Sequence, residues 1–192
     1  MGAGMTSQSN RRRRTAMLVG VLGLVAVLLA LLGYGLRPAA SIGLKGESAP
    51  SFSLQIFSGA QAGETLTLEG LAGKVVVLHV WASWCDECRP EMLALERVWR
   101  DYRSRGVEVV GVDYLDTDTA GLAYLADLNI SFPNGPDVGS KIFQAYHCSG
   151  VPETFIIDHE GIVRYVHIGV VSETELRSLL DMLIIGKEAK QS

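Results

Sequence analysis

Cysteine is scarce in this sequence: only three of its 192 residues are cysteines. Three cysteines can close only one disulfide within the chain, so a small fold held together by several disulfides is excluded. Two of them, Cys85 and Cys88, are separated by two residues, and Cys148 stands alone. This spacing is typical of a pair that exchanges disulfides or binds a metal, which makes Cys85 and Cys88 the first candidates for a functional site.

Acidic residues are absent from residues 1–40, which contain five arginines, Arg11 to Arg14 and Arg37. The rest of the chain holds the other 12 of the 17 Lys and Arg residues and all 21 Asp and Glu residues. The C-terminal part is therefore acidic and lacks the basic face that nucleic-acid binding requires. We expect no nucleic-acid partner.

Charged residues are also absent from residues 15–36. In a helix this run reaches roughly 33 Å, enough to cross a hydrocarbon core of about 30 Å. The arginines before it predict a cytoplasmic N-terminus and a domain on the extracytoplasmic side. A cleaved signal peptide is the alternative, but the run is long and no clear cleavage site precedes Ser41. The predicted order is a basic tail (1–14), a single-pass anchor (15–36), a linker (37–50), a folded domain (51–185) and a tail (186–192).

Apolar periodicity in residues 51–185 predicts an α/β domain. Strands are expected where apolar residues alternate or run continuously, and helices where they recur every three or four residues. The expected order, with helices following most strands and a hairpin near the end, gives a central mixed β-sheet flanked by helices. Strands are predicted at 51–57, 64–71, 75–81, 107–112, 153–158 and 162–168, and helices after Cys85 and at 118–129, 138–146 and 172–185.

Cys85 and Cys88 lie at the junction between the apolar run 75–81 and a pattern with helical spacing. Unpaired N–H groups and the dipole at a helix N-terminus favour a thiolate. We predict that Cys85 attacks a disulfide and that Cys88, one turn further, resolves the mixed disulfide. A zinc site is disfavoured, because the only other pair of residues that could complete the ligand set, His147-Cys148, comes much later in the chain.

Four stretches together resemble a known family. They are WASWCDECRPE (81–91), APSFSL (49–54), GKVV (73–76) and GVPETFIID (150–158), and they are similar to membrane-anchored TlpA, ResA and CcmG (DsbE) proteins. The resemblance implies a thioredoxin fold with an insertion at 116–136. It also implies an extracytoplasmic thiol–disulfide oxidoreductase of a bacterial cytoplasmic membrane. Such proteins often reduce apocytochrome c during cytochrome c maturation, receive electrons from a membrane donor of the CcdA/DsbD type, and need no cofactor beyond their own disulfide.

The resemblance also suggests roles for residues around the cysteines. Pro152 matches the cis-proline that faces the disulfide and positions the substrate chain. Glu91, three residues after Cys88, matches a glutamate that relays the Cys88 proton; the alternative is a solvated residue in the first helical turn. Glu153 matches an acidic residue that contacts substrate; the alternative is a surface strand residue. Trp84 and Val151 are expected to flank the substrate.

Asp86 and Glu87 depart from the family pattern, in which a proline often occupies the second intervening position. Two carboxylates beside Cys85 disfavour its thiolate, which destabilises the reduced form and lowers the reduction potential. We therefore predict a reductant of protein disulfides.

Three alternatives remain for the function. A disulfide oxidant or isomerase would share every motif and differ in potential. A thiol peroxidase shares the APxFxL start, but the chain lacks the PxxxTxxC pattern that peroxiredoxins would require. A Cu(I)-binding module would use Cys85, Cys88 and Cys148, with His147 as a further ligand. Cys148 itself is interpreted as a small buried residue, with an off-pathway disulfide as another possibility.

Overall fold

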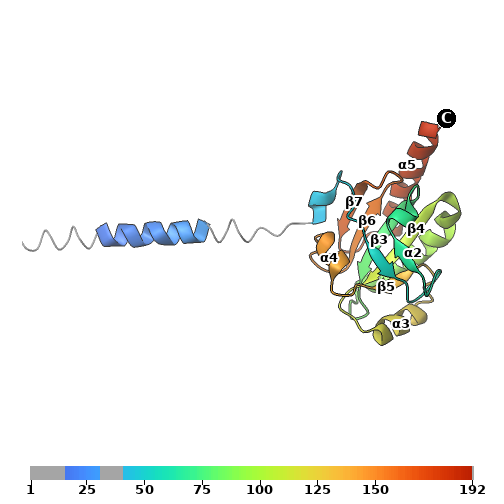
Figure 1. The fold of residues 1–192 in the computed structure, drawn as a ribbon, viewed down its shortest axis with the longest axis horizontal. Helices are drawn as coiled ribbons and strands as arrows, with labels where there is room; N and C mark the ends of the chain where they lie inside the picture. Colours follow the sequence, from blue (N-terminus) through green and yellow to red (C-terminus); the bar gives the residue numbers. More distant parts are fainter. Residues whose placement is uncertain (1–15, 31–40, 192) are drawn as a thin grey trace, which may run out of the picture. The chain divides into compact units, whose positions relative to one another are not determined.

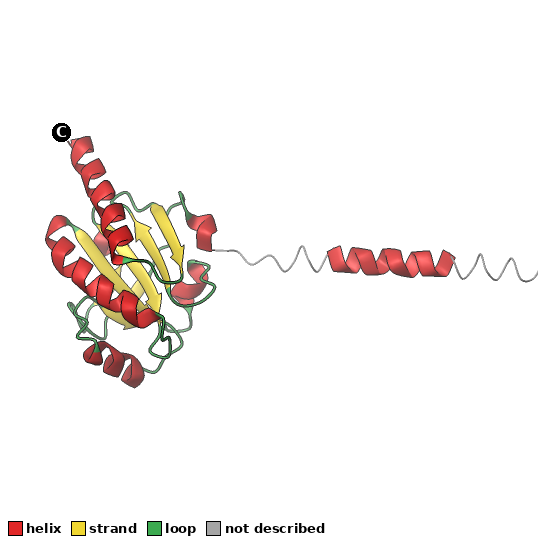
Figure 2. Cartoon of the chain, turned by 180° about the vertical axis from the view of Figure 1, so that it is seen from behind, coloured by secondary structure: helices red, strands yellow, loops and turns green. Residues whose placement is uncertain are grey.

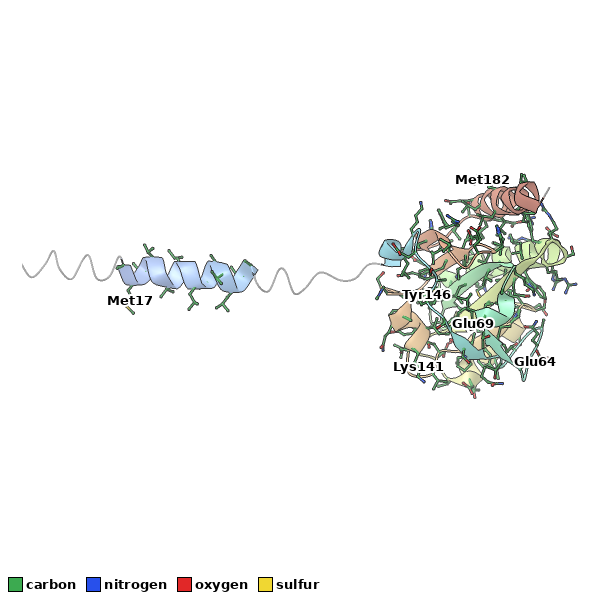
Figure 3. All side chains as sticks on the ribbon, turned by 45° about the horizontal axis from the view of Figure 1, so that its top comes forward. Met17, Glu64, Glu69, Lys141, Tyr146 and Met182 are labelled. Atoms are coloured by element: carbon green, nitrogen blue, oxygen red, sulfur yellow. A yellow bond between two sulfur atoms is a disulfide. The ribbon has the colours of Figure 1, made fainter. Side chains whose placement is uncertain are left out.

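The computed structural model describes residues 16–30 and 41–191 and divides the chain into two compact units, Met1–Ala39 and Ala40–Ser192. In the first unit, residues 16–30 form a helix whose side chains are exposed, with Met17 at 74% exposure (Figure 3). Within the described ranges, no helix combines the length and apolar character needed to cross a membrane. The basic tail, residue 15 and residues 31–36 of the expected anchor lie outside the described residues.

The second unit is built on a five-stranded sheet in the order β5-β4-β3-β6-β7 (Figure 1). The central strand β3 pairs in parallel with β4 and antiparallel with β6, so the sheet is mixed, as predicted. Because β6 runs antiparallel to β3, the end of β3 and the start of β6 lie at the same edge of the sheet. The strands are β3 (Val75–Trp81), β4 (Val107–Asp113), β5 (Asn134–Pro136), β6 (Glu153–Ile157) and β7 (Val163–Ile168).

Side chains of β3 alternate between two cores because both faces of the strand are covered. Val75, Val77 and Trp81 pack with α2 (Cys88–Tyr102), α3 (Asp118–Asp127) and α5 (Glu173–Gln191). The two long helices, α2 and α5, lie in front of the strands in Figure 2. The intervening β3 residues pack on the other face against α4 (Lys141–Ala145) and the hairpin of β1 (Ser53–Gln55) and β2 (Thr65–Thr67).

The structure differs from the expectations in several places, among them the end of the predicted strand 64–71, which forms the 3-10 helix η2 (Glu69–Leu71). Part of the predicted linker belongs to the domain: η1 (Ser41–Leu44) is a short 3-10 helix, and the Gly46 and Ala49 N–H groups donate to Val163 and Gly161. The predicted C-terminal tail is instead the end of α5, which runs to Gln191. Strand β5 is absent from the predicted strands; it was missed because Gly135 and Pro136 are poor strand formers.

Candidate active site

The candidate site lies at the edge of the sheet where β3 ends and β6 begins. Val80 pairs with Glu153 in the antiparallel register. Residues 82–87, which follow β3, and Val151-Pro152, which precede β6, therefore meet at this edge. The fold brings the Cys85–Cys88 pair and the proline together although 64 positions separate Cys88 from Pro152.

Cys85 and Cys88 form a disulfide, with their Cα atoms 5.4 Å apart. Cys85 is 7% exposed and Cys88 is fully buried. Cys85 is therefore the more accessible of the two sulfurs, which fits its predicted role as the attacking cysteine. The Cys88 N–H at the start of α2 donates to Cys85 Sγ at 3.1 Å. This bond favours a thiolate on Cys85 once the disulfide opens.

Trp84 presents an apolar surface beside the disulfide. Its side chain is 58% exposed, and its Nε1–H donates to the Leu115 carbonyl at 3.3 Å. Leu115 is 66% exposed and has a positive φ of 51°. Leu115 was not predicted from the sequence, because a loop residue after β4 gives no signal of its own. The exposed pair agrees with the expected place of Trp84 beside a substrate, which stays a prediction.

The charges around Cys85 are mostly acidic. Asp86 and Glu87 are both exposed. The neighbouring Arg89 guanidinium is held by Asp127 at 2.7 Å. Because this cation is already paired with a carboxylate, it does little to offset Asp86 and Glu87.

Glu91 is fully buried, so its interpretation as a solvated first-turn residue is wrong. Its Oε1 accepts a hydrogen bond of 2.6 Å from the Thr154 hydroxyl. Burial raises the pKa of Glu91 to about 7, an effect that the Thr154 hydroxyl and the nearby Val171 N–H partly offset. A carboxyl with such a pKa can both give and take a proton near neutral pH.

His79 completes this buried cluster and was missed from the sequence. Its Nδ1 lies 2.8 Å from Thr154 Oγ1 and 3.4 Å from Glu91 Oε1. Burial lowers the pKa of His79 to about 3, so the imidazole is neutral at physiological pH and the contact with Glu91 is not an ion pair. The available signal was a histidine inside an otherwise apolar strand, 75–81, that is buried on both faces.

The Val151-Pro152 peptide is cis, which confirms the prediction. Pro152 is buried, and Val151 is half-buried and packs against the core cluster that contains both cysteines. The Pro152 carbonyl accepts a hydrogen bond of 2.9 Å from the Gly169 N–H after β7. The Pro152 carbonyl is therefore held from the β7 side.

Glu153 corrects both of our interpretations, because each required an accessible side chain and Glu153 is 0% exposed. Its Oε1 accepts from the Ser149 N–H at 2.7 Å, the Ser149 hydroxyl at 2.6 Å and the Gly150 N–H at 3.3 Å. The carboxylate thus holds the turn that leads to Pro152, and its side chain has no exposed surface for a substrate to contact.

Cys148 is half-buried and lies beside this turn. Burial, followed by the Glu153 carboxylate and more weakly by Asp137, raises the pKa of its thiol well above the ordinary value. The raised pKa favours the protonated thiol. Because Cys148 is only half-buried, its interpretation as a small buried residue is met in part. In the part of the chain that the structure describes, no three His, Cys, Asp or Glu side chains are arranged to hold a metal ion. The Cu(I) alternative stays a prediction.

Asp113 is a further buried carboxyl that the sequence did not reveal. It ends β4 opposite Trp81, is 3% exposed, and packs so tightly on α3 that a Cβ on Gly121 would lie 2.1 Å from its Oδ2. Burial, with smaller contributions from Asp116 and Asp118, raises the pKa of Asp113 to about 8.

Comparison with known proteins agrees with this site. Residues 45–166 match the model of the AhpC/TSA family. The chain is 29% identical to thiol-disulfide oxidoreductase ResA of Bacillus subtilis over 181 residues, covering 92% of this chain and 97% of ResA. It is 36% identical to thiol:disulfide interchange protein DsbE of Allochromatium vinosum over 157 residues, covering 78% of this chain and 82% of DsbE.

Solved structures agree in fold. A thiol:disulfide interchange protein of the thioredoxin family from Chlorobium tepidum superposes with a TM-score of 0.64 at 25% identity, covering 71% of this chain and 95% of that one. Together with the Cys85–Cys88 disulfide, these matches show that the chain belongs to the AhpC/TSA family and is a thiol–disulfide oxidoreductase of the ResA/DsbE type with a thioredoxin-like fold.

Proposed function

We propose that this protein is a membrane-tethered, extracytoplasmic reductant of protein disulfides. The observation that carries the reducing direction is the charge around Cys85: Asp86 and Glu87 are exposed beside it, and Arg89 is tied to Asp127. A carboxylate about 4 Å from a thiolate in water disfavours it by about 1 kcal/mol. The helix N-terminus favours it by about 0.3–1 kcal/mol. Two carboxylates at such a separation would outweigh the helix and destabilise the reduced form.

The reaction begins with the reduced pair. The Cys85 thiolate attacks a substrate disulfide, the substrate disulfide bond breaks, and one substrate sulfur leaves as a thiolate. Cys88 then loses its proton and attacks Cys85 Sγ, which releases the second substrate sulfur and leaves the Cys85–Cys88 disulfide. Glu91 is the proposed acceptor of the Cys88 proton. Val151 and Pro152 position the substrate chain beside Cys85.

Location and partners follow from the N-terminal sequence and from the family. The uncharged run 15–36 behind four arginines supports a single-pass anchor with the domain outside the cytoplasm. A reductant in an oxidising compartment needs a supply of electrons, for which a membrane donor of the CcdA/DsbD type is the natural source. Apocytochrome c is the proposed substrate, with other envelope proteins that carry disulfides as the alternative.

A trapping experiment tests this function. In a Cys88→Ser/Cys148→Ser chain, Cys85 is the only thiol, and a substrate attacked by it stays attached through a disulfide. Expression in a cytochrome c-producing bacterium, followed by isolation under acid quench, should yield reducible adducts that contain a Cys-x-x-Cys protein. The matched Cys85→Ser/Cys148→Ser chain should yield none. Equal adducts from both chains would overturn the assignment of Cys85.

The reduction potential of the Cys85–Cys88 pair distinguishes a reductant from an oxidant or isomerase. Equilibration of the purified domain with glutathione buffers should give a value near that of thioredoxin, about −270 mV, and far from the value of about −120 mV typical of the oxidant DsbA. A measurement of peroxide consumption distinguishes the proposed reductant from a thiol peroxidase. We expect none above the rate of free dithiol, because both site cysteines lie in a Cys-x-x-Cys pair and the PxxxTxxC pattern is absent from the sequence.

A further inference from the structure

A row of three buried polar side chains crosses the layer between the sheet and α2. His79 on β3 and Thr154 on β6 are direct partners in the antiparallel register, so their side chains lie on the same face. Glu91 reaches them from α2. All three are 0% exposed. Buried polar groups are retained where their hydrogen bonds do something specific, since their burial is otherwise costly.

The hydrogen bonds of this row have a fixed direction. The Thr154 hydroxyl has one proton, and it donates that proton to Glu91 Oε1 at 2.6 Å. Thr154 Oγ1 is therefore the acceptor in its 2.8 Å contact with His79 Nδ1. This assignment requires His79 to carry its proton on Nδ1. Its Nε2 is then an acceptor, and it has no hydrogen-bond partner among the described residues.

Because Nε2 of His79 has no described hydrogen-bond partner in either tautomer, the contacts of Nδ1 decide which nitrogen carries the proton. Reversal of the row, with Glu91 donating to Thr154 and Thr154 to His79, would require a proton on Nε2 in place of Nδ1. The reversed row would set the lone pair of Nδ1 against the oxygen lone pairs of Glu91 Oε1, 3.4 Å away, whereas an Nδ1–H is attracted to that oxygen. Glu91 Oε1 is thus kept as an acceptor, and a proton on this carboxyl group goes to Oε2, which also lacks a hydrogen-bond partner in the described part of the chain.

Glu91 lies one helical turn after Cys88, so both residues share a face of α2. Cys88 is fully buried in the core cluster beside this face. We propose that His79, acting through the Thr154 hydroxyl, is a positioning residue that keeps Glu91 Oε1 as an acceptor and thereby leaves Oε2 to exchange a proton with Cys88. This inference rests on the proposed function, because it assigns His79 to the proton step of the same exchange.

The proton and the electrons balance in both directions. When the enzyme is reduced, an incoming thiolate attacks Cys85 Sγ, the Cys85–Cys88 bond breaks, and its electron pair stays on Cys88, which takes the proton from Glu91 Oε2. When a substrate is reduced, Cys88 returns that proton to Glu91, attacks the mixed disulfide on Cys85, and releases the substrate thiolate.

Few other groups face Glu91. Thr154 and His79 face it from β6 and β3, and the Val171 N–H faces it from the segment before α5. The ion pairs between α2 and α5, Arg97 with Glu173 and Arg177 with Asp101, lie at the exposed rim. The titration of Glu91 is therefore governed by its burial and by this row.

The tautomer of His79 is a direct test. In the oxidised full-length protein labelled with 15N-histidine, ring nitrogen shifts near neutral pH should show a neutral imidazole with the proton on Nδ1. Because the chain has four histidines, His79→Asn assigns the signal. A proton on Nε2, or a charged ring, would overturn the proposal.

The pH profile of the resolving step is the second test. Cys85 is loaded as a mixed disulfide with thionitrobenzoate, and release of that thiolate by Cys88 is followed by absorbance from pH 5 to 10. Thr154→Val removes a hydrogen bond to a carboxylate and should move the midpoint assigned to Glu91 upward by about one pH unit. His79→Leu should move it in the same direction, and by less, because the hydroxyl remains.

Conservative replacements provide the matched controls. Thr154→Ser keeps the hydroxyl, and His79→Asn keeps an N–H donor near the place of Nδ1, so both should restore the wild-type midpoint. In a Glu91→Gln chain, which lacks the titrating group, Thr154→Val should cause no further shift. Profiles of Thr154→Val and His79→Leu that superpose on the wild-type profile would refute the role of the row. Failure of the wild-type chain itself to release thionitrobenzoate at any pH would instead refute the proposed function.

Discussion

The backbone N–H of Cys88 donates a hydrogen bond to Cys85 Sγ at 3.1 Å. The first turn of α2 therefore stabilises negative charge on the attacking sulfur, while Asp86 and Glu87, exposed between the two cysteines, oppose it. The potential of the pair reflects the balance between a fixed backbone contribution and a side-chain contribution that can be changed by mutation.

Replacement of Asp86 and Glu87 by Pro and His should raise the reduction potential. Removing two carboxylates stabilises the Cys85 thiolate by about 1–2 kcal/mol, which corresponds to about 20–40 mV for a two-electron couple. The measurement is a glutathione redox titration of both chains at low salt, repeated at high salt, where the difference should shrink. An unchanged or lower potential in the variant would contradict the assigned role of these two residues.

Glu153→Ala should lower stability and leave substrate choice unchanged. The substitution leaves the Ser149 N–H, the Ser149 hydroxyl and the Gly150 N–H without their acceptor, which costs about 2 kcal/mol. Urea denaturation of the oxidised protein measures this loss. Glu64→Ala is the matched control, because Glu64 is an exposed glutamate (Figure 3) and its loss should change stability by less than about 0.5 kcal/mol. Equal stabilities of the two variants would argue against the proposed support of the turn.

The sequence was sufficient to predict the main elements near the cysteines because strong signals coincide there. The run 75–81 is apolar except for His79 and forms β3 with the expected bounds, and the helical spacing after Cys88 gives α2. The cis peptide before Pro152 followed from resemblance. By contrast, β5 is defined only by its pairing with β4, a tertiary contact that Gly135 and Pro136 do not announce.

The buried titratable residues of the site could not be predicted either, because their roles depend on which residues the fold places around them. Glu91 has a sequence signal through its spacing from Cys88. His79 takes its role from Thr154, a neighbour far along the chain. Asp113 and Glu153 take theirs from the way nearby residues, Gly121 and Ser149, fold back onto them. Glu153 illustrates the difficulty: a glutamate beside an active-site proline suggests contact with substrate, and only the register of β6 shows that it turns inward to hold its own loop.

Cys148→Ser should leave the redox equilibrium unchanged. The Cys148 thiol has a raised pKa because of burial and the neighbouring Glu153, so it is a poor nucleophile at neutral pH. In the oxidised protein it should react with iodoacetamide far more slowly than free cysteine, and urea should restore the normal rate. Mass spectrometry of the alkylated chain measures both rates. Rapid labelling of Cys148 in the folded protein, or a potential altered by Cys148→Ser, would bring it back as a partner of Cys85 and Cys88.

Asp113→Asn should stabilise the protein at alkaline pH. The pKa of Asp113 is about 8 in the folded chain against an ordinary value of 3.8. Between these values the folded chain holds a proton that the unfolded chain has lost, so stability falls as the pH rises toward 8, by at most about 1.4 kcal/mol per pH unit from this group. Asparagine does not titrate and should remove this contribution.

Unfolding free energies of Asp113→Asn and wild type should therefore diverge between pH 5 and 9, with the variant more stable at pH 9. Glu91 contributes a similar pH dependence of stability to both chains below its pKa of about 7, so its contribution cancels in the difference between their unfolding free energies. Asp127→Asn removes the same charge from an exposed carboxylate and should run parallel to wild type across the range. Parallel curves for Asp113→Asn would mean that Asp113 is ionised in the folded protein, with its charge satisfied by a cation or solvent.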